Sequence, residues 1–133
     1  MMTSHASGSF EVKLGPLGPY NTDDGGKLGR MSIDKQFRGD LEATSKGEML
    51  SAGTDVKGSA GYVAIERVTG LLNGRSGSFV LQHNATMTRG EPYLNIVVVP
   101  DSGTGALKGL TGTMAIIIAD GRHSYKFDYS LQT

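Results

Sequence analysis

The features that constrain the fold most are three residue pairs that end in glycine. Each pair lies between runs that alternate apolar and polar residues. Asn73-Gly74 separates "GYVAIERVTGLL" from "RSGSFVLQH". Asn-Gly is favoured in two-residue hairpin turns because both positions adopt positive φ. Arg89-Gly90 and Asp120-Gly121 are placed in the same way. The sequence therefore predicts an antiparallel hairpin around each pair.

The rest of the chain also alternates between turn residues, and no long segment shows helical periodicity. Further strands are expected at residues 7–14, at 30–45 with a bulge at Gly39, at 48–52 after a turn at Lys46-Gly47, and at 93–99. Glycine-rich loops are expected at residues 15–29 and 101–109. With hairpins at 61–87 and 110–131, the sequence predicts one all-β domain over residues 1–133. We expect an eight-stranded antiparallel up-and-down barrel, because closure removes the exposed edges of so wide a sheet.

Charge balance and amino-acid usage exclude several classes of protein. Thirteen basic residues balance thirteen acidic ones, so there is no electrostatic footprint for nucleic acid or for an anionic membrane. The absence of cysteine excludes disulfides, thiolate metal sites and cysteine nucleophiles. The segment "MMTSHASGSFEV" shows no secretory signal, and apolar runs such as "NIVVVP" are too short to cross a bilayer as helices. We expect a soluble cytoplasmic protein.

The two-residue turns determine which side chains share a face of the sheet. Around Asn73-Gly74, Glu66 pairs with Leu81 and Ala64 pairs with His83. The other two turns extend this face into the neighbouring strands, and its apolar character places it inside the barrel. The interior set of interest is Tyr62, Glu66, Phe79, Leu81, His83, Ile96, Met114, Ile116, His123, Tyr125, Phe127 and Tyr129.

Glu66 and His83 stand out on this face because a carboxylate is costly to bury without a partner. The two residues lie diagonally across one strand pair, where long side chains can meet. Three interpretations stay open. The pair could fix strand register, could orient a bound molecule together with Tyr62, or could catalyse a reaction. In the last case the protein is a cofactor-independent cyclase or isomerase, with Glu66 as acid or base and His83 setting its charge.

The leading hypothesis is a barrel that binds an apolar or aromatic small molecule in its interior. The expected lining is Tyr62, Phe79, Leu81, Ile96, Met114, Ile116, Tyr125, Phe127 and Tyr129. No metal or cofactor is expected, because His5, His83 and His123 lack the close spacing of a metal site and "GTGALKG" does not open a helix. A filled barrel with a structural or interaction role is the remaining alternative, and cavity volume separates it from the others.

The stretches "YVAIERVTGLLNGRSGSFVLQH", "SGTGALKGLTGTMAI" and "HSYKFDYSL" resemble a bacterial family known as domain of unknown function 3224. The most specific part is the pattern G-x-L-x-G-R-x-G-S-F-x-L-Q-H, from Gly70 to His83. The family is similar in fold to allene oxide cyclase and dirigent barrels. This resemblance implies an eight-stranded antiparallel barrel with a central cavity and a homo-oligomer, either a dimer or a trimer. It transfers no catalytic residue, and the family has no established activity.

Overall fold

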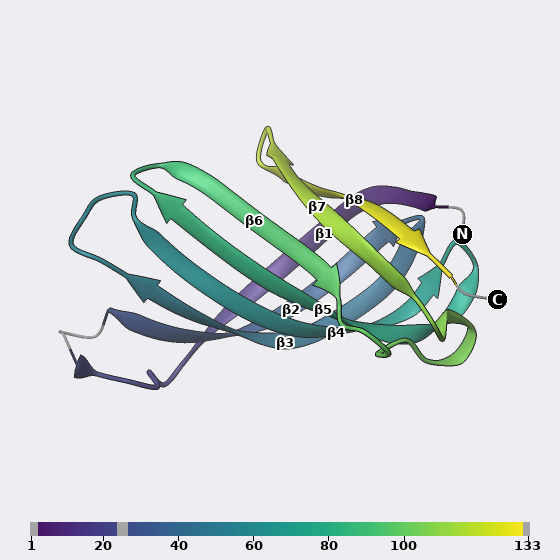
Figure 1. Ribbon diagram of the computed structural model, residues 1–133, viewed down its shortest axis with the longest axis horizontal. Coiled ribbons are helices and arrows are strands. Elements are labelled where there is room, and N and C mark those ends of the chain that lie inside the picture. Colours follow the sequence, from purple (N-terminus) through teal and green to yellow (C-terminus); the bar gives the residue numbers. More distant parts are fainter. Residues whose placement is uncertain (1–2, 24–26, 132–133) are drawn as a thin grey trace.

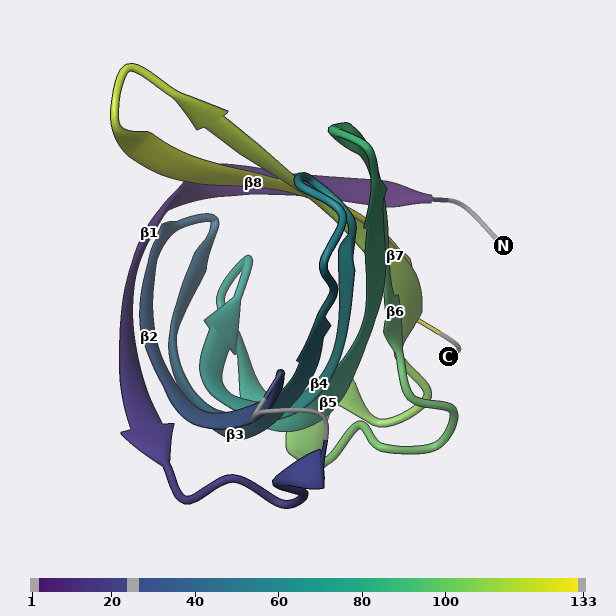
Figure 2. The ribbon, with the colours of Figure 1, turned by 90° about the vertical axis from the view of Figure 1, so that its left-hand side faces the viewer.

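The chain folds into a closed barrel of eight antiparallel strands (Figure 1), in a computed structural model that describes residues 3–23 and 27–131. Each strand pairs with the next along the chain, and β1 pairs with β8 to close the ring seen in Figure 2. The predicted up-and-down barrel is confirmed. The likeness to allene oxide cyclases stays a prediction. The strands are β1 (Ser4–Leu17), β2 (Leu28–Gly39), β3 (Leu41–Gly53), β4 (Ala60–Leu72), β5 (Arg75–Thr88), β6 (Glu91–Val98), β7 (Thr111–Ala119) and β8 (Arg122–Ser130).

All three predicted hairpin turns are confirmed. Asn73 and Gly74 have φ values of 46° and 83°, and the turns at Arg89-Gly90 and Asp120-Gly121 have the same left-handed backbone. The predicted registers follow: Ala64 pairs with His83, and Ile116 pairs with Tyr125. Side chains predicted to share the interior face therefore do share it.

The predicted boundary between the second and third strands is wrong. Residues 30–45 are not one bulged strand, because the chain reverses at Gly39 and Asp40 between β2 and β3. Gly39 has a φ of 100°, which an L-residue rarely adopts. The two predicted strands still become two observed strands, so the total of eight is confirmed although their limits are not.

Lys46-Gly47, predicted as a turn, lies inside β3. A Cβ atom at Gly47 would collide with the carbonyl oxygen of Ile65 in β4, so glycine is needed there for the close approach of two strands.

The predicted loop 15–29 is also too long, because β1 continues to Leu17 and β2 begins at Leu28. Residues 24–26 of that loop, and the ends 1–2 and 132–133 of the predicted domain, lie outside the described residues.

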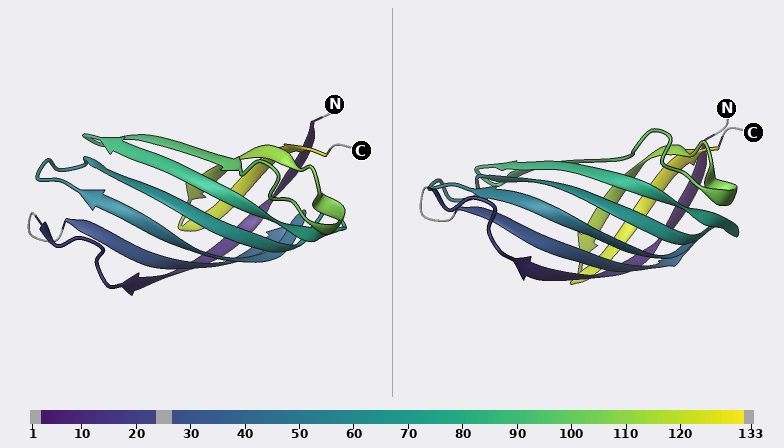
Figure 3. Two further views of the ribbon diagram at one scale, coloured as in Figure 1. Left: turned by 60° about the horizontal axis from the view of Figure 1, so that its bottom comes forward. Right: turned by 90° about the horizontal axis from the view of Figure 1, so that it is seen from below.

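Buried side chains pack together in one half of the barrel. Figure 3 shows both chain termini at the end of the barrel where the loop between β6 and β7 lies. Phe79 stacks on Phe127 with ring centroids 5.6 Å apart, and Phe127 stacks on Tyr129 at 5.3 Å. The second predicted loop closes this end. Its short 3-10 helix, η2 (Gly105–Leu107), buries Leu107 against the core, and the backbone N–H of Thr104 donates to the carbonyl oxygen of Ser78 in β5.

The described residues contain no helix with the length and apolar character needed to cross a bilayer.

The ladder between β6 and β7 is short. Within residues 27–131 it consists of two pairs, Ile96 with Met114 and Val97 with Thr113, whereas β4 and β5 pair along thirteen residues. Figure 1 shows the β7–β8 hairpin leaning away from β6 beyond this point. The barrel is therefore joined least firmly at this position.

The hydroxyl of Tyr125 holds the β2–β3 turn in place. It donates a hydrogen bond to the carbonyl oxygen of Arg38 (2.9 Å) and accepts one from the backbone N–H of Leu41 (2.9 Å). Burial is the main reason that the pKa of Tyr125 is raised, so the phenol stays protonated and can donate.

Tyr125→Phe should lower the free energy of unfolding by about 1–3 kcal/mol, because it leaves buried backbone groups of the turn without their partner. Urea denaturation measures this loss. Tyr93→Phe, at a side chain that is 55% exposed, is the control and should change stability by less than about 0.5 kcal/mol. Equal effects of the two substitutions would show that the phenol does not hold the turn.

Candidate functional site

A cluster of charged side chains lies inside the barrel, centred on the fully buried Glu66 of β4. Its Oε2 atom accepts hydrogen bonds from Lys35 Nζ (2.9 Å) and from His83 Nε2 (2.6 Å). Its Oε1 atom accepts one from Ser45 Oγ (2.7 Å). Both oxygens of the carboxylate are therefore bound by donors from the protein, and the predicted contact between Glu66 and His83 is formed.

Four consecutive strands supply this cluster. Lys35 of β2 and Ser45 of β3 are direct cross-strand partners, Glu66 lies on β4 and His83 on β5. Each occupies an inward position in a strand that alternates exposed and buried residues. The cluster therefore ties together the registers of four strands, because a one-residue slip in any of them would turn its member out of the barrel.

Glu66 is ionised. Burial alone raises its pKa, but the hydrogen bond from His83 and the charge and hydrogen bond of Lys35 outweigh burial and bring the pKa of Glu66 down to about 2. An ionised carboxylate can only accept hydrogen bonds, so the hydrogen in the contact with His83 belongs to Nε2 of the imidazole.

Aromatic rings surround the cationic end of the cluster. The ammonium of Lys35 lies 5.1 Å from the ring centroid of Phe10 and 5.7 Å from that of Phe37, which stabilises the charge through the ring quadrupoles. The Tyr62 ring lies 6.3 Å from the His83 ring. Burial and the charge of Glu66 both raise the pKa of Tyr62, so its hydroxyl remains a donor at neutral pH.

A cavity of about 270 Å³ adjoins the cluster, on the side away from the packed half of the barrel. Lys35, His83, Tyr62 and His123 are its polar lining residues, while Glu66 stands behind it. The next inward residues along β2 and β5, Phe37 and Leu81, are fully buried, so Lys35 and His83 form the inner end of the cavity. The apolar wall is Phe10, Val12, Leu14, Ile33, Met49, Leu94, Ile116 and Ile118.

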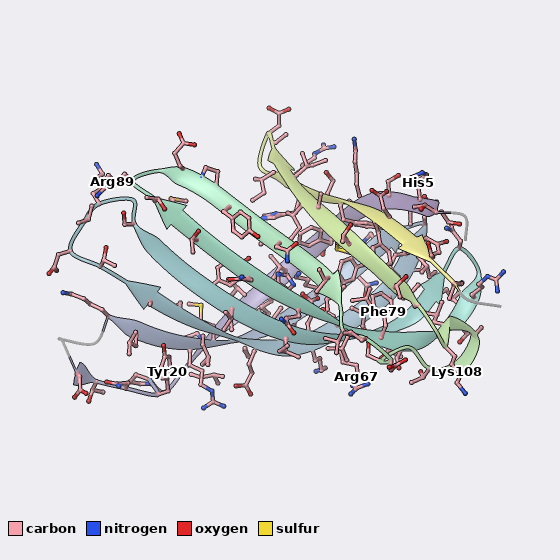
Figure 4. The ribbon with its side chains drawn as sticks, in the orientation of Figure 1. His5, Tyr20, Arg67, Phe79, Arg89 and Lys108 are labelled. Carbon is pink, nitrogen blue, oxygen red and sulfur yellow. The ribbon has the colours of Figure 1, made fainter. Side chains whose placement is uncertain are left out.

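A second hollow, of about 670 Å³, lies at the mouth of the barrel between the loop after β3 and the turn between β5 and β6. It shares Met49, Tyr62, Leu94 and Ile118 with the inner cavity, so the two spaces are neighbours. Figure 4 places Arg89 at this end of the molecule and Phe79 toward the opposite, packed end.

The structure divides the predicted lining residues into two groups. Tyr62 and Ile116 line the inner cavity beside His83. The others lie in the packed core, outside the walls of either hollow, namely Phe79, Leu81, Ile96, Met114, Tyr125, Phe127 and Tyr129. They pack against one another, so the open space inside the barrel lies nearer the mouth than these residues.

Lys35 and Ser45 complete the cluster and were not among the residues predicted from the sequence. The signal was present, because Lys35 falls between the buried residues Ile33 and Phe37 in a period-two alternation. Recognising it required the turn at Gly39-Asp40, which places the two residues opposite each other on neighbouring strands.

The three histidines do not come together. His5 is exposed on β1, where its Nδ1 atom lies 2.6 Å from Oδ1 of Asp128 (Figure 4), whereas His83 and His123 line the inner cavity. Among residues 3–23 and 27–131, no group of three or more His, Asp or Glu side chains is arranged to hold a metal ion.

Acid should destabilise the protein through Glu66. Its pKa in the folded state, about 2, lies below its ordinary value of 4.5, so its contribution to stability is present above pH 4.5 and is lost as pH falls towards 2. This difference in pKa corresponds to a loss of roughly 3 kcal/mol in the free energy of unfolding. Urea unfolding followed between about pH 6 and pH 2.5 measures the loss, and Lys35→Met/Glu66→Gln should show a correspondingly smaller decline. The same decline in both proteins would contradict this assignment.

Removing only the charge of Glu66 should lower the free energy of unfolding more than removing the charges of both Glu66 and Lys35. Glu66→Gln leaves the Lys35 ammonium buried without a counter-charge and should lower the free energy of unfolding by about 3–5 kcal/mol. Adding Lys35→Met should recover part of that loss, which a double-mutant cycle measures. The exposed pair of Lys46 and Asp34 is the control, with an expected coupling below about 1 kcal/mol. Additive effects of Lys35→Met and Glu66→Gln would argue against coupled charges.

Comparison with known proteins identifies the family. The model of the family described as "Protein of unknown function (DUF3224)" matches residues 6–129. The crystal structure of a DUF3224 protein with unknown function from Shewanella oneidensis MR-1, at 1.84 Å resolution, is similar with a TM-score of 0.95. That protein is 56% identical in sequence, over 99% of this chain and 99% of its own. Comparison with curated proteins gives no match. The chain belongs to the DUF3224 family of proteins of unknown function.

Proposed function

We propose that the protein binds an apolar or aromatic small molecule that carries a carbonyl or a similar hydrogen-bond acceptor. The observation that supports this most is the cavity of about 270 Å³, which combines an apolar wall with Lys35 and His83 at its inner end. Small-molecule sites are typically concave, mainly apolar and equipped with a few polar groups that orient the ligand.

The chemistry of the inner end favours a neutral acceptor. Lys35 carries three N–H donors, of which one is directed to Glu66, and Tyr62 adds a hydroxyl donor on the same lining. The positive charge of Lys35 is already balanced by Glu66. A carbonyl oxygen can accept from these donors without adding an uncompensated charge to a buried site.

The space available argues against the alternative of a filled structural barrel. The inner cavity lies beside the charge cluster, and the mouth hollow is its neighbour toward the open end. Ligand sites commonly measure about 300–1,000 Å³. A molecule with a flat aromatic body could lie with its polar group at Lys35 and its body between Ile33, Leu94 and Ile116.

The ketone 1-(2-naphthyl)propan-2-one is a suitable probe, because its naphthyl fluorescence reports binding and its ketone supplies the acceptor. Ile116→Trp should fill the inner cavity and weaken binding about tenfold or more, which is about 1.4 kcal/mol or more. Ile117→Trp is the matched control, since the adjacent side chain points outward and is 39% exposed. It should bind the probe as the unmodified protein does.

A second comparison tests the role of the polar end. 2-Propylnaphthalene has the same aromatic body without the acceptor and should bind more weakly than the ketone. Equal binding of the ketone by the Ile116→Trp and Ile117→Trp variants would place the ligand outside the barrel interior and contradict the proposal.

A further inference from the structure

One ring nitrogen of His83 forms a hydrogen bond, and the other has no hydrogen-bond partner among the described residues. Its Nε2–H donates to the ionised Glu66, so in the neutral imidazole Nδ1 carries the free lone pair. Nδ1 has no hydrogen-bond partner among the described residues. In that part of the chain, every side-chain nitrogen or oxygen that is completely buried has a partner, so Nδ1 is not completely buried. Because His83 lines the inner cavity, its Nδ1 opens onto that cavity.

A cationic donor stands next to this base. Lys35 contacts the same Oε2 atom of Glu66 as His83 does, and it lines the same cavity. The two residues are therefore neighbours at the inner end, where one offers a lone pair and the other an ammonium. A base beside a positive charge in an apolar, partly closed space is the arrangement that stabilises an enolate as it forms.

We propose that the barrel catalyses proton transfer at the carbon next to a ketone or aldehyde carbonyl, with His83 as the base and Lys35 as the group that stabilises the enolate. This inference rests on the proposed function, because it requires a bound carbonyl compound. It adds a reaction and a substrate class to that site.

The step is balanced without a cofactor. Nδ1 of His83 takes the proton from the α-carbon, the C–H electron pair forms a carbon–carbon double bond, and the carbonyl π pair moves to the oxygen beside Lys35. His83 becomes an imidazolium whose charge is stabilised by Glu66. Return of a proton to the same carbon regenerates the ketone with an exchanged hydrogen. In a β,γ-unsaturated ketone, return to the γ-carbon shifts the double bond into conjugation.

Glu66 is a positioning residue in this scheme. Both of its oxygens are occupied and its side chain is fully buried behind the cavity lining, so it holds the tautomer of His83 and does not itself meet the substrate. The sequence-based hypothesis that Glu66 acts as the acid or base is replaced here by a role for the histidine that it orients.

Hydrogen–deuterium exchange of 1-(2-naphthyl)propan-2-one in D₂O tests the inference. Loss of the benzylic CH₂ signal in proton NMR measures enolisation, and naphthyl fluorescence measures binding in the same samples. The unmodified protein should accelerate exchange above the buffer rate. His83→Gln should reduce the acceleration about tenfold or more while binding changes little. His5→Gln is the matched control on the outer surface and should exchange at the unmodified rate.

A second variant guards against misfolding of His83→Gln. In His83→Ala, added imidazole should restore exchange above the rate that the same concentration of imidazole gives in buffer without protein. Binding of the ketone without exchange above buffer would overturn this inference and leave the proposed function intact. No binding would overturn both. Exchange in His83→Gln at the unmodified rate would remove His83 from the reaction.

Discussion

One carboxylate oxygen, Oε2 of Glu66, joins a lysine and a histidine in the middle of an apolar barrel, and the rest of the structure depends on that contact. A buried carboxylate without donors would be too costly to keep charged. Donors from β2, β3 and β5 meet this cost, which fixes the registers of four strands. The cluster also divides the interior, with aromatic packing on one side and open space on the other.

Local turn chemistry determined how much of the fold could be predicted. Asn73-Gly74 and Asp120-Gly121 are short-range signals, and each fixes two strands and their register without reference to the rest of the chain. The turn at Gly39-Asp40 is not a two-residue turn, because the pairing of Phe37 with Ala43 centres it on the single residue Asp40. It is held by Tyr125, which lies far along the sequence, and a contact of that range leaves no local pattern.

The residues of the site could be predicted only on strands whose pairing register could be predicted. Glu66 and His83 could be paired because both flank a recognised turn. Lys35 and Ser45 could not, because their pairing depends on the turn at Gly39-Asp40, which the sequence pattern did not predict. The position of the cavity was also beyond the sequence. Periodicity shows which residues point inward, but which half is filled depends on side-chain volumes and on how Leu107 and its loop close one end.

The two-pair ladder between β6 and β7, within residues 27–131, is the place where the circumference of the barrel is held by the fewest paired residues. Widening the ring between β4 and β5 would break a long series of hydrogen bonds, whereas widening it at the β6–β7 seam breaks few. Leu94 and Ile118, which flank this seam, border both hollows. The open half of the barrel can therefore change its width at this seam at the lowest cost in hydrogen bonds, while the stacked rings of Phe79, Phe127 and Tyr129 stay in place.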